Sequence, residues 1–156
     1  MRIEELQVGD WVNVKMRDRE TNKEKVKTGR VVEISPYYKR VGVAFSPEDA
    51  KRWFGTGFPP EAIEPIPLSD ELLERNGFEF YSVIKLKERR LEKDNSGISL
   101  YTTDEESKNI GGYHITLCVD DKDIRDLSIT LDMRIFFVHQ LQHLIPLSKI
   151  KKEIEI

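Results

Sequence analysis

The sequence has 156 residues, of which 38% are hydrophobic and 34% are charged, and its formal net charge at pH 7 is −3. This length allows one medium domain or two small ones, and the composition predicts a folded chain with a modest core and a heavily charged surface. The acidic balance argues against a dedicated nucleic-acid-binding protein. The charge is uneven, because residues 1–60 carry an excess of three positive charges and the remainder an excess of six negative charges.

The cysteine and hydropathy patterns exclude further classes. A single cysteine, Cys118, rules out a disulfide within the chain and a cysteine-based zinc site. The first residues show no signal-peptide pattern, and no apolar run approaches the about 18 residues that a membrane-spanning helix needs. We therefore expect a cytoplasmic protein without a membrane partner.

The first half of the chain reads as short strands joined by turns. Strands are predicted over residues 11–16, 26–35 and 40–45, with a bulge or bend at Gly29, and Ser46 is placed to cap one helical turn. This spacing, with the opening LQVGDWV, resembles the SH3-like small barrels. We expect such a barrel over residues 1–66, and a barrel of this kind implies no particular function.

Residues 63–78 (IEPIPLSDELLERNGF) predict a junction between two halves. Pro65 and Pro67 favour an extended edge segment, because they lack N–H donors and have a fixed φ. Ser69 is placed to cap a short helix, and Asn76-Gly77 predicts a left-handed exit from it.

The second half, residues 67–156, predicts an antiparallel sheet with one or two short helices. The expected strands are residues 79–90, 98–102, 112–119 and 124–131. A helix is predicted over residues 136–145 and is stopped by Pro146, after which the charged tail is expected to fray or to add an edge strand. The predicted fold class is thus α+β and mostly β.

The segment His139-Gln140-Leu141-Gln142-His143 is the sharpest chemical motif. Histidines at positions i and i+4 of a helix share a face, as in the zinc peptidase motif HExxH, but Gln140 replaces the glutamate that acts as the base. No third ligand is identified. We expect the helix to pack its apolar face on the sheet with both histidines toward solvent, and metal binding at His139 and His143 is the alternative.

A set of aromatic residues defines a candidate binding site in the first half. They lie in or beside predicted loops, where they would form a groove for an extended peptide or stack on single-stranded bases with neighbouring basic residues. The alternative is that they cover the open end of the barrel. The residues are Tyr37, Tyr38, Trp53, Phe54 and Phe58.

The remaining motifs do not complete a catalytic or cofactor site. The acidic run 120–126 misses the EF-hand spacing, and Gly55-Thr56-Gly57 lacks the lysine of a phosphate loop. We therefore expect no enzymatic activity and no cofactor.

Three segments carry a resemblance to known proteins: IEELQVGDWV at the start, IEPIPLSDELLERNGF in the middle and FVHQLQHL near the end. The chain resembles a family of small uncharacterised proteins of gut bacteria and their phages or mobile elements, which implies no assigned activity. The expected function is a non-catalytic binding or accessory protein with a protein partner. The alternatives are a nucleic-acid-associated module, which uses the basic and aromatic loops of the first half, and a degenerate HxxxH metal-binding protein.

Overall fold

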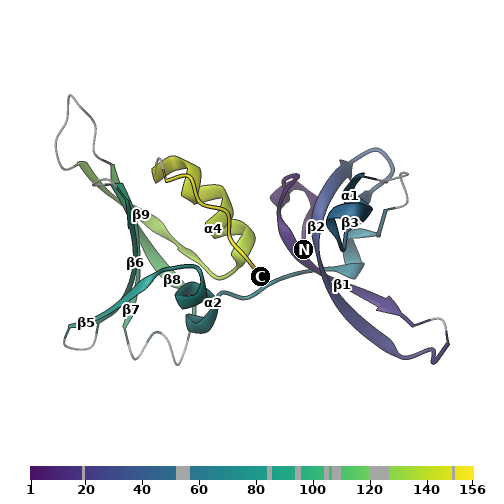
Figure 1. The fold of residues 1–156 in the computed structure, drawn as a ribbon, viewed down its shortest axis with the longest axis horizontal. Helices are drawn as coiled ribbons and strands as arrows, with labels where there is room; N and C mark the ends of the chain where they lie inside the picture. Colours follow the sequence, from purple (N-terminus) through teal and green to yellow (C-terminus); the bar gives the residue numbers. More distant parts are fainter. Residues whose placement is uncertain are drawn as a thin grey trace. The chain divides into compact units, whose positions relative to one another are not determined.

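In the computed structural model, the chain divides into two compact units, Met1–Ile66 (unit 1) and Pro67–Ile156 (unit 2) (Figure 1). The structure describes residues 1–18, 20–51, 57–83, 86–93, 96–103, 106, 110–119, 127–148 and 150–156. The protein is mostly β, with two antiparallel sheets and few short helices, which confirms the predicted α+β class. None of the helices in the described ranges is long and apolar enough to cross a membrane.

Unit 1 contains a four-stranded antiparallel sheet with the strand order β3-β2-β1-β4. Its elements are η1 (Ile3–Glu5), β1 (Trp11–Arg17), β2 (Glu24–Ser35), β3 (Arg40–Ala44), α1 (Pro47–Lys51), η2 (Pro60–Ala62) and β4 (Ile63–Pro65). Pro65 pairs with Val12 in the edge strand β4, where the missing N–H of proline is tolerated. The predicted cap at Ser46 is confirmed, because its Oγ accepts a hydrogen bond from the Asp49 N–H at 3.1 Å.

The predicted SH3-like barrel is not confirmed, because the sheet does not close. On the other edge of β3, the pairing that the described residues show is a single antiparallel bridge between Val41 and Phe58. From there the chain passes through η2 and joins the opposite edge of the sheet as β4. The result is an open sheet whose two edges are linked by one short connection.

The core of unit 1 is formed by aliphatic side chains from one face of this sheet and by Leu6, which follows η1. Its buried members are Leu6, Val12, Val14, Val31, Val41, Val43 and Ile63. Gly29 is buried as well, but the bulge that we predicted there is wrong: Gly29 pairs regularly with Val12, and the register shifts between Val31 and Glu33 instead. The glycine serves close packing, since a Cβ at this position would lie 2.6 Å from Val43 Cγ1.

Unit 2 is built on a five-stranded antiparallel meander with the order β5-β6-β7-β8-β9. Its elements are α2 (Asp70–Arg75), β5 (Glu79–Val83), β6 (Leu86–Lys93), β7 (Ser96–Thr103), β8 (Tyr113–Val119), β9 (Leu127–Ile135), α4 (Val138–Leu144) and η3 (Ile145–Ser148). The single long strand that we predicted over residues 79–90 is wrong. It is a hairpin in which Val83 pairs with Leu86, and its sequence lacks the glycine, proline or asparagine that usually marks a turn.

One face of the meander is covered by η3, which packs against β7 and β8 and continues directly from α4 (Figure 1). The buried residues beneath include Ile98, Leu100, Ile115 and Leu117. The α-helix ends at Leu144, two residues before Pro146, and the chain then continues as the 3-10 helix.

The junction behaves as its sequence predicts. Ser69 Oγ accepts the N–H of Leu72 at 3.2 Å, which caps α2, and Gly77 adopts a left-handed φ of 79°. Asp70 opens the helix and joins it to the sheet, because Oδ1 of Asp70 accepts the Tyr113 hydroxyl at 2.9 Å and Arg89 Nε at 3.1 Å. Partial burial and the Asp70 carboxylate both raise the pKa of Tyr113, so its hydroxyl stays a donor at neutral pH.

The C-terminal tail is anchored, and neither of the two states that we predicted for it occurs. The side chains of Ile150 and Ile154 are buried, and no strand is formed in the described residues 150–156. The buried Asn76 side chain bonds the tail in both directions: its Nδ2 donates to the Glu155 carbonyl at 2.9 Å, and its Oδ1 accepts the Glu155 N–H at 2.8 Å. The amide thus pairs with the tail as a neighbouring strand would.

Candidate functional site

The turn between β2 and β3 exposes two aromatic side chains. Pro36 opens the turn with a fixed φ, and Lys39 closes it with a left-handed φ of 48° and an N–H bond of 3.2 Å to the Pro36 carbonyl. Tyr37 is 87% exposed and Tyr38 is 72% exposed. Their ring centroids lie 4.9 Å apart at an interplanar angle of 86°, the edge-to-face arrangement that aromatic pairs prefer.

Tyr38 also borders a groove of about 420 Å³ on unit 1. The other lining residues are Glu33, Ser35, Arg40, Gly42 and Gly57. Arg40 Nη1 donates to the Gly57 carbonyl at 2.8 Å, which ties the two walls together. The groove therefore offers a carboxylate, a guanidinium, hydroxyls and an aromatic edge, and this chemistry suits hydrogen bonding and stacking.

The other aromatic residues of the predicted site are placed differently. Phe58 is half-buried, packs against the unit 1 core and lies 5.9 Å from the Phe45 ring in an edge-to-face contact. Its position favours the alternative that we gave for it, a residue that covers the end of the sheet. Trp53 and Phe54 lie outside the described residues. Of the predicted residues, Tyr37 and Tyr38 are thus the two that the described structure exposes, and Tyr38 borders the groove.

The histidine pair on α4 does not have the geometry that we predicted. His139 is buried at 3% exposure, stacked at 5.9 Å on Phe137, whereas we expected both histidines to face solvent. At about 100° per residue, the buried positions of α4 span about 220°, a wider arc than one apolar stripe covers. The ring centroids of His139 and His143 lie 5.9 Å apart.

Gln140 in the same motif has a structural role. Its Oε1 accepts the N–H groups of Phe136 and Phe137 at 2.8 and 3.2 Å, which satisfies donors at the start of α4. Within the described part of the chain, no three histidine, cysteine, aspartate or glutamate residues gather as metal ligands would. At the position where the HExxH motif has its catalytic glutamate, this chain therefore has a glutamine that caps the helix.

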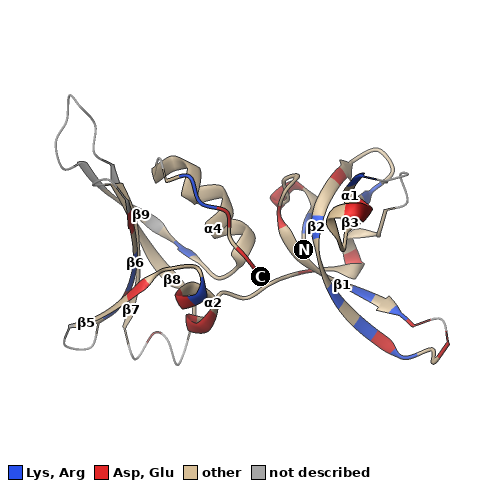
Figure 2. Cartoon of the chain, viewed as in Figure 1, with Lys and Arg blue, Asp and Glu red and all other residues tan. Residues whose placement is uncertain are grey.

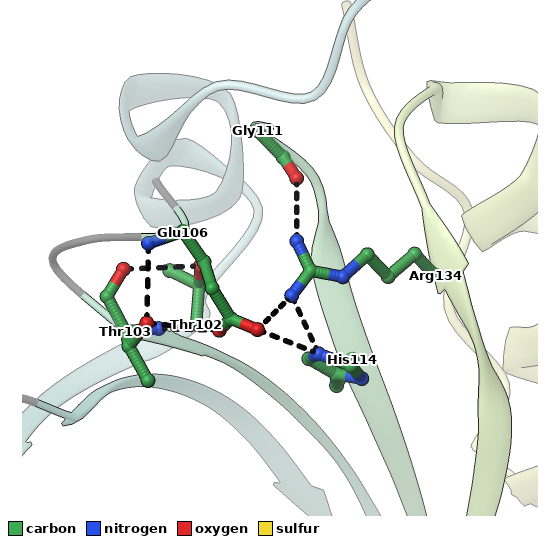
Figure 3. A network of polar contacts seen from close by, with 6 residues as sticks. All are labelled: Thr102, Thr103, Glu106, Gly111, His114 and Arg134. Carbon is green, nitrogen blue, oxygen red and sulfur yellow. Dashed lines mark hydrogen bonds and ion pairs between the residues drawn. The ribbon is translucent and has the colours of Figure 1, made fainter. Parts of the chain in front are cut away.

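A second polar cluster lies on unit 2 and was not predicted from the sequence (Figure 3). The Glu106 carboxylate forms an ion pair with Arg134 and accepts the N–H and Oγ1 of Thr103 at 3.1 and 3.0 Å. Arg134 also donates to the Gly111 carbonyl at 3.1 Å and lies 2.7 Å from His114 Nε2. The same ring nitrogen lies 3.4 Å from Glu106 Oε1, so Glu106, His114 and Arg134 are in mutual polar contact.

This cluster belongs to a row of side chains that crosses the whole sheet. Consecutive register partners form the row Tyr81, Glu88, Tyr101, His114 and Arg134, one residue from each strand. The Tyr101 ring stacks on His114 with centroids 5.3 Å apart. No sequence signal links residues so far apart in the chain, since only the strand register brings them together. The closed set of bonds indicates that the cluster fastens Glu106 and Gly111 to the sheet.

Acidification or loss of the Glu106 carboxylate is expected to release this attachment. The bonds from Thr103, followed by His114 and Arg134, lower the pKa of Glu106, so its contribution to stability is complete above the ordinary glutamate pKa of about 4.3. It is lost as the pH falls through the lower folded-state pKa. The amides of Ile110 and Gly111 both donate to the Glu106 carbonyl and report on this attachment.

The measurement is amide hydrogen exchange followed by NMR. Glu106→Ala should accelerate the exchange of the Ile110 and Gly111 amides at neutral pH, whereas Glu92→Ala, on the exposed end of β6, should leave both rates unchanged. Unchanged protection in Glu106→Ala would show that the cluster does not hold these residues.

Comparison with known proteins identified no matching family model, no similar curated protein and no similar solved structure.

Proposed function

We propose that the protein is a non-catalytic binding or accessory protein that contacts a partner protein through Tyr37 and Tyr38 of unit 1. The observation that carries this proposal is the exposure of two adjacent tyrosine rings on a turn that Pro36 and Lys39 constrain. Tyrosine supplies a large amphipathic contact area with only two side-chain torsions to immobilise, and it is enriched in interface hot spots.

The adjoining groove supports a protein ligand. Its lining combines Glu33 and Arg40 with hydroxyl groups, a mixture that matches the alternating donors and acceptors of a peptide backbone. A polyanion is a poorer fit for this groove, because the Glu33 carboxylate lies in its lining and would repel a phosphate. A phage or mobile-element origin remains a proposal from the sequence resemblance.

The test replaces both tyrosines by serine. The tagged Tyr37→Ser/Tyr38→Ser protein should lose a specific protein partner that the unaltered chain captures from lysate of its native host in the presence of nuclease. Folding stability should change by no more than about 0.5 kcal/mol, because both rings are exposed.

The matched control is Tyr81→Ser, an exposed tyrosine on unit 2. This variant should retain the partner. Capture of the same proteins by the double variant and by the unaltered chain would contradict a role for this turn.

A further inference from the structure

Beyond the four-stranded sheet, β1 and β2 continue as a two-stranded ribbon, which we call the arm (residues 15–18 and 20–27). The strand β3 pairs with β2 only from Arg30 onward, and β4 pairs with β1 only at residues 12–14. Residues 15–17 therefore have β2 as their only sheet partner in the described structure. Figure 1 shows this ribbon extending away from the rest of unit 1.

The arm carries the positive charge of the first part of the chain (Figure 2). Residues 15–27 contain six lysines and arginines and three acidic residues, whereas the rest of residues 1–60 contains six of each sign. The whole excess of three positive charges in the sequence of that region thus falls within residues 15–27, and two of the three charges remain when Arg19, which lies outside the described residues, is left out. A charge asymmetry of this kind indicates an electrostatic contact surface rather than a requirement of the fold.

Three of these cations stand at alternate positions near the tip of the arm. Lys25 and Lys27 project from one face of β2, about 6.8 Å apart along the strand, and Lys23 directly precedes the strand. All three are exposed, and none of them forms an ion pair with a carboxylate in the described part of the chain. Lys27 Nζ lies 4.5 Å above the centre of the Phe45 ring at the base of the arm.

The opposite face of the arm carries acidic residues beside its cations. Lys15 forms an ion pair with Glu64, and Arg17 is the register partner of Glu24. The register partners of Lys25 and Lys27 are Met16 and Val14, which carry no charge, so a polyanion meets fewer carboxylates on the face of these two lysines.

The tip of the arm is organised by Asp18. Its Oδ1 accepts the N–H of Glu20 at 3.1 Å and the N–H and Oγ1 of Thr21 at 2.9 and 3.0 Å. The Asp18 N–H donates to the Lys23 carbonyl at 2.9 Å. Asp18 is thus engaged in turn bonds, which, together with the charge of Lys25, lower the pKa of its carboxyl and fix the path of the ribbon.

We propose that the arm binds duplex DNA through contacts of Lys23, Lys25 and Lys27 with the phosphate backbone. A two-stranded ribbon fits the major groove of B-form DNA, which is about 12 Å wide, whereas the major groove of A-form RNA is too narrow for side chains to enter. The lysines are point charges without the planar fork that reads guanine, so the contact is to the backbone and is independent of sequence. Three phosphate contacts predict that log K falls with log salt concentration at a slope of about −2.7.

The experiment measures binding of a fluorescein-labelled 25-base-pair duplex to the full chain by fluorescence anisotropy between 50 and 200 mM NaCl. Lys23→Gln/Lys25→Gln/Lys27→Gln should weaken binding at least tenfold at about 50 mM salt and flatten the salt dependence by about 2 to 3 units of slope. The matched control, Arg75→Gln/Lys151→Gln/Lys152→Gln, removes the same charge from exposed basic residues of unit 2 and should change affinity less than threefold.

A third variant separates charge from folding. Lys23→Arg/Lys25→Arg/Lys27→Arg keeps the three charges and should retain the affinity. The proposal is overturned if the unaltered chain does not bind the duplex, if both glutamine variants lose affinity equally, or if double-stranded RNA of the same length binds as tightly as DNA.

Discussion

Replacing Gly29 by alanine is expected to destabilise unit 1 by about 2 kcal/mol. The new Cβ would lie 2.6 Å from Val43 Cγ1, 2.7 Å from the Ala44 carbonyl oxygen and 2.8 Å from Phe45 Cδ1. A β-branched side chain and a backbone atom yield little, so β2 and β3 must move apart. The clash also outweighs the stabilisation of up to about 1 kcal/mol that a glycine-to-alanine change gives by restricting the unfolded chain.

Tryptophan fluorescence measures the unfolding of unit 1, because both tryptophans belong to that unit. Trp11 and Trp53, the two tryptophans of the chain, are both within residues 1–66. The midpoint of a urea titration followed by tryptophan fluorescence should fall by about 1 to 2 M, given a slope of about 1 to 2 kcal/mol per M for a unit of this size.

A double-mutant cycle supplies the control. Val43→Ala removes Cγ1 and should recover part of the loss when combined with Gly29→Ala, while the Ala44 carbonyl still limits the recovery. A Gly29→Ala protein as stable as the unaltered chain would show that the strands accommodate a methyl group at this position.

Local signals in the sequence predicted local structure well. Ser69 and Gly77 define the ends of α2 because a cap and a left-handed residue act over three or four positions, and a single sequence displays that chemistry directly. The hairpin between β5 and β6 was missed for the same reason, since the sequence around Val83 and Leu86 contains no residue that specifies a turn.

Features that depend on distant parts of the chain could not be predicted. The histidine motif predicted an exposed face for His139, but the helix is buried over a wider arc than its own periodicity indicates. The row from Tyr81 to Arg134 exists only because five strands share one register. Tyr37 and Tyr38, in contrast, followed from sequence as loop aromatics, and the structure adds the groove beside them.

Replacing Asn76 by alanine is expected to destabilise unit 2 by about 3 kcal/mol. The change removes the bonds from Nδ2 to the carbonyls of Leu72 and Glu155, both at 2.9 Å, and the bond of 2.8 Å from the Glu155 N–H to Oδ1. Each hydrogen bond contributes about 1 kcal/mol, and burial prevents water from replacing Asn76 fully. The tail then loses the contact that holds Ile154 in the core.

Far-UV circular dichroism and amide exchange at Glu155 measure this change. The Glu155 amide should exchange much faster, and the thermal transition of the sheet should shift to lower temperature, while the urea midpoint by tryptophan fluorescence stays the same because both tryptophans are in unit 1.

Asn76→Asp is the informative companion, because it keeps an acceptor for the Glu155 N–H and loses both donor bonds. The hydrogen-exchange protection of the Glu155 amide in Asn76→Asp should lie between that of the alanine variant and that of the unaltered chain. Equal protection in all three proteins would mean that the tail is held by Ile150 and Ile154 alone.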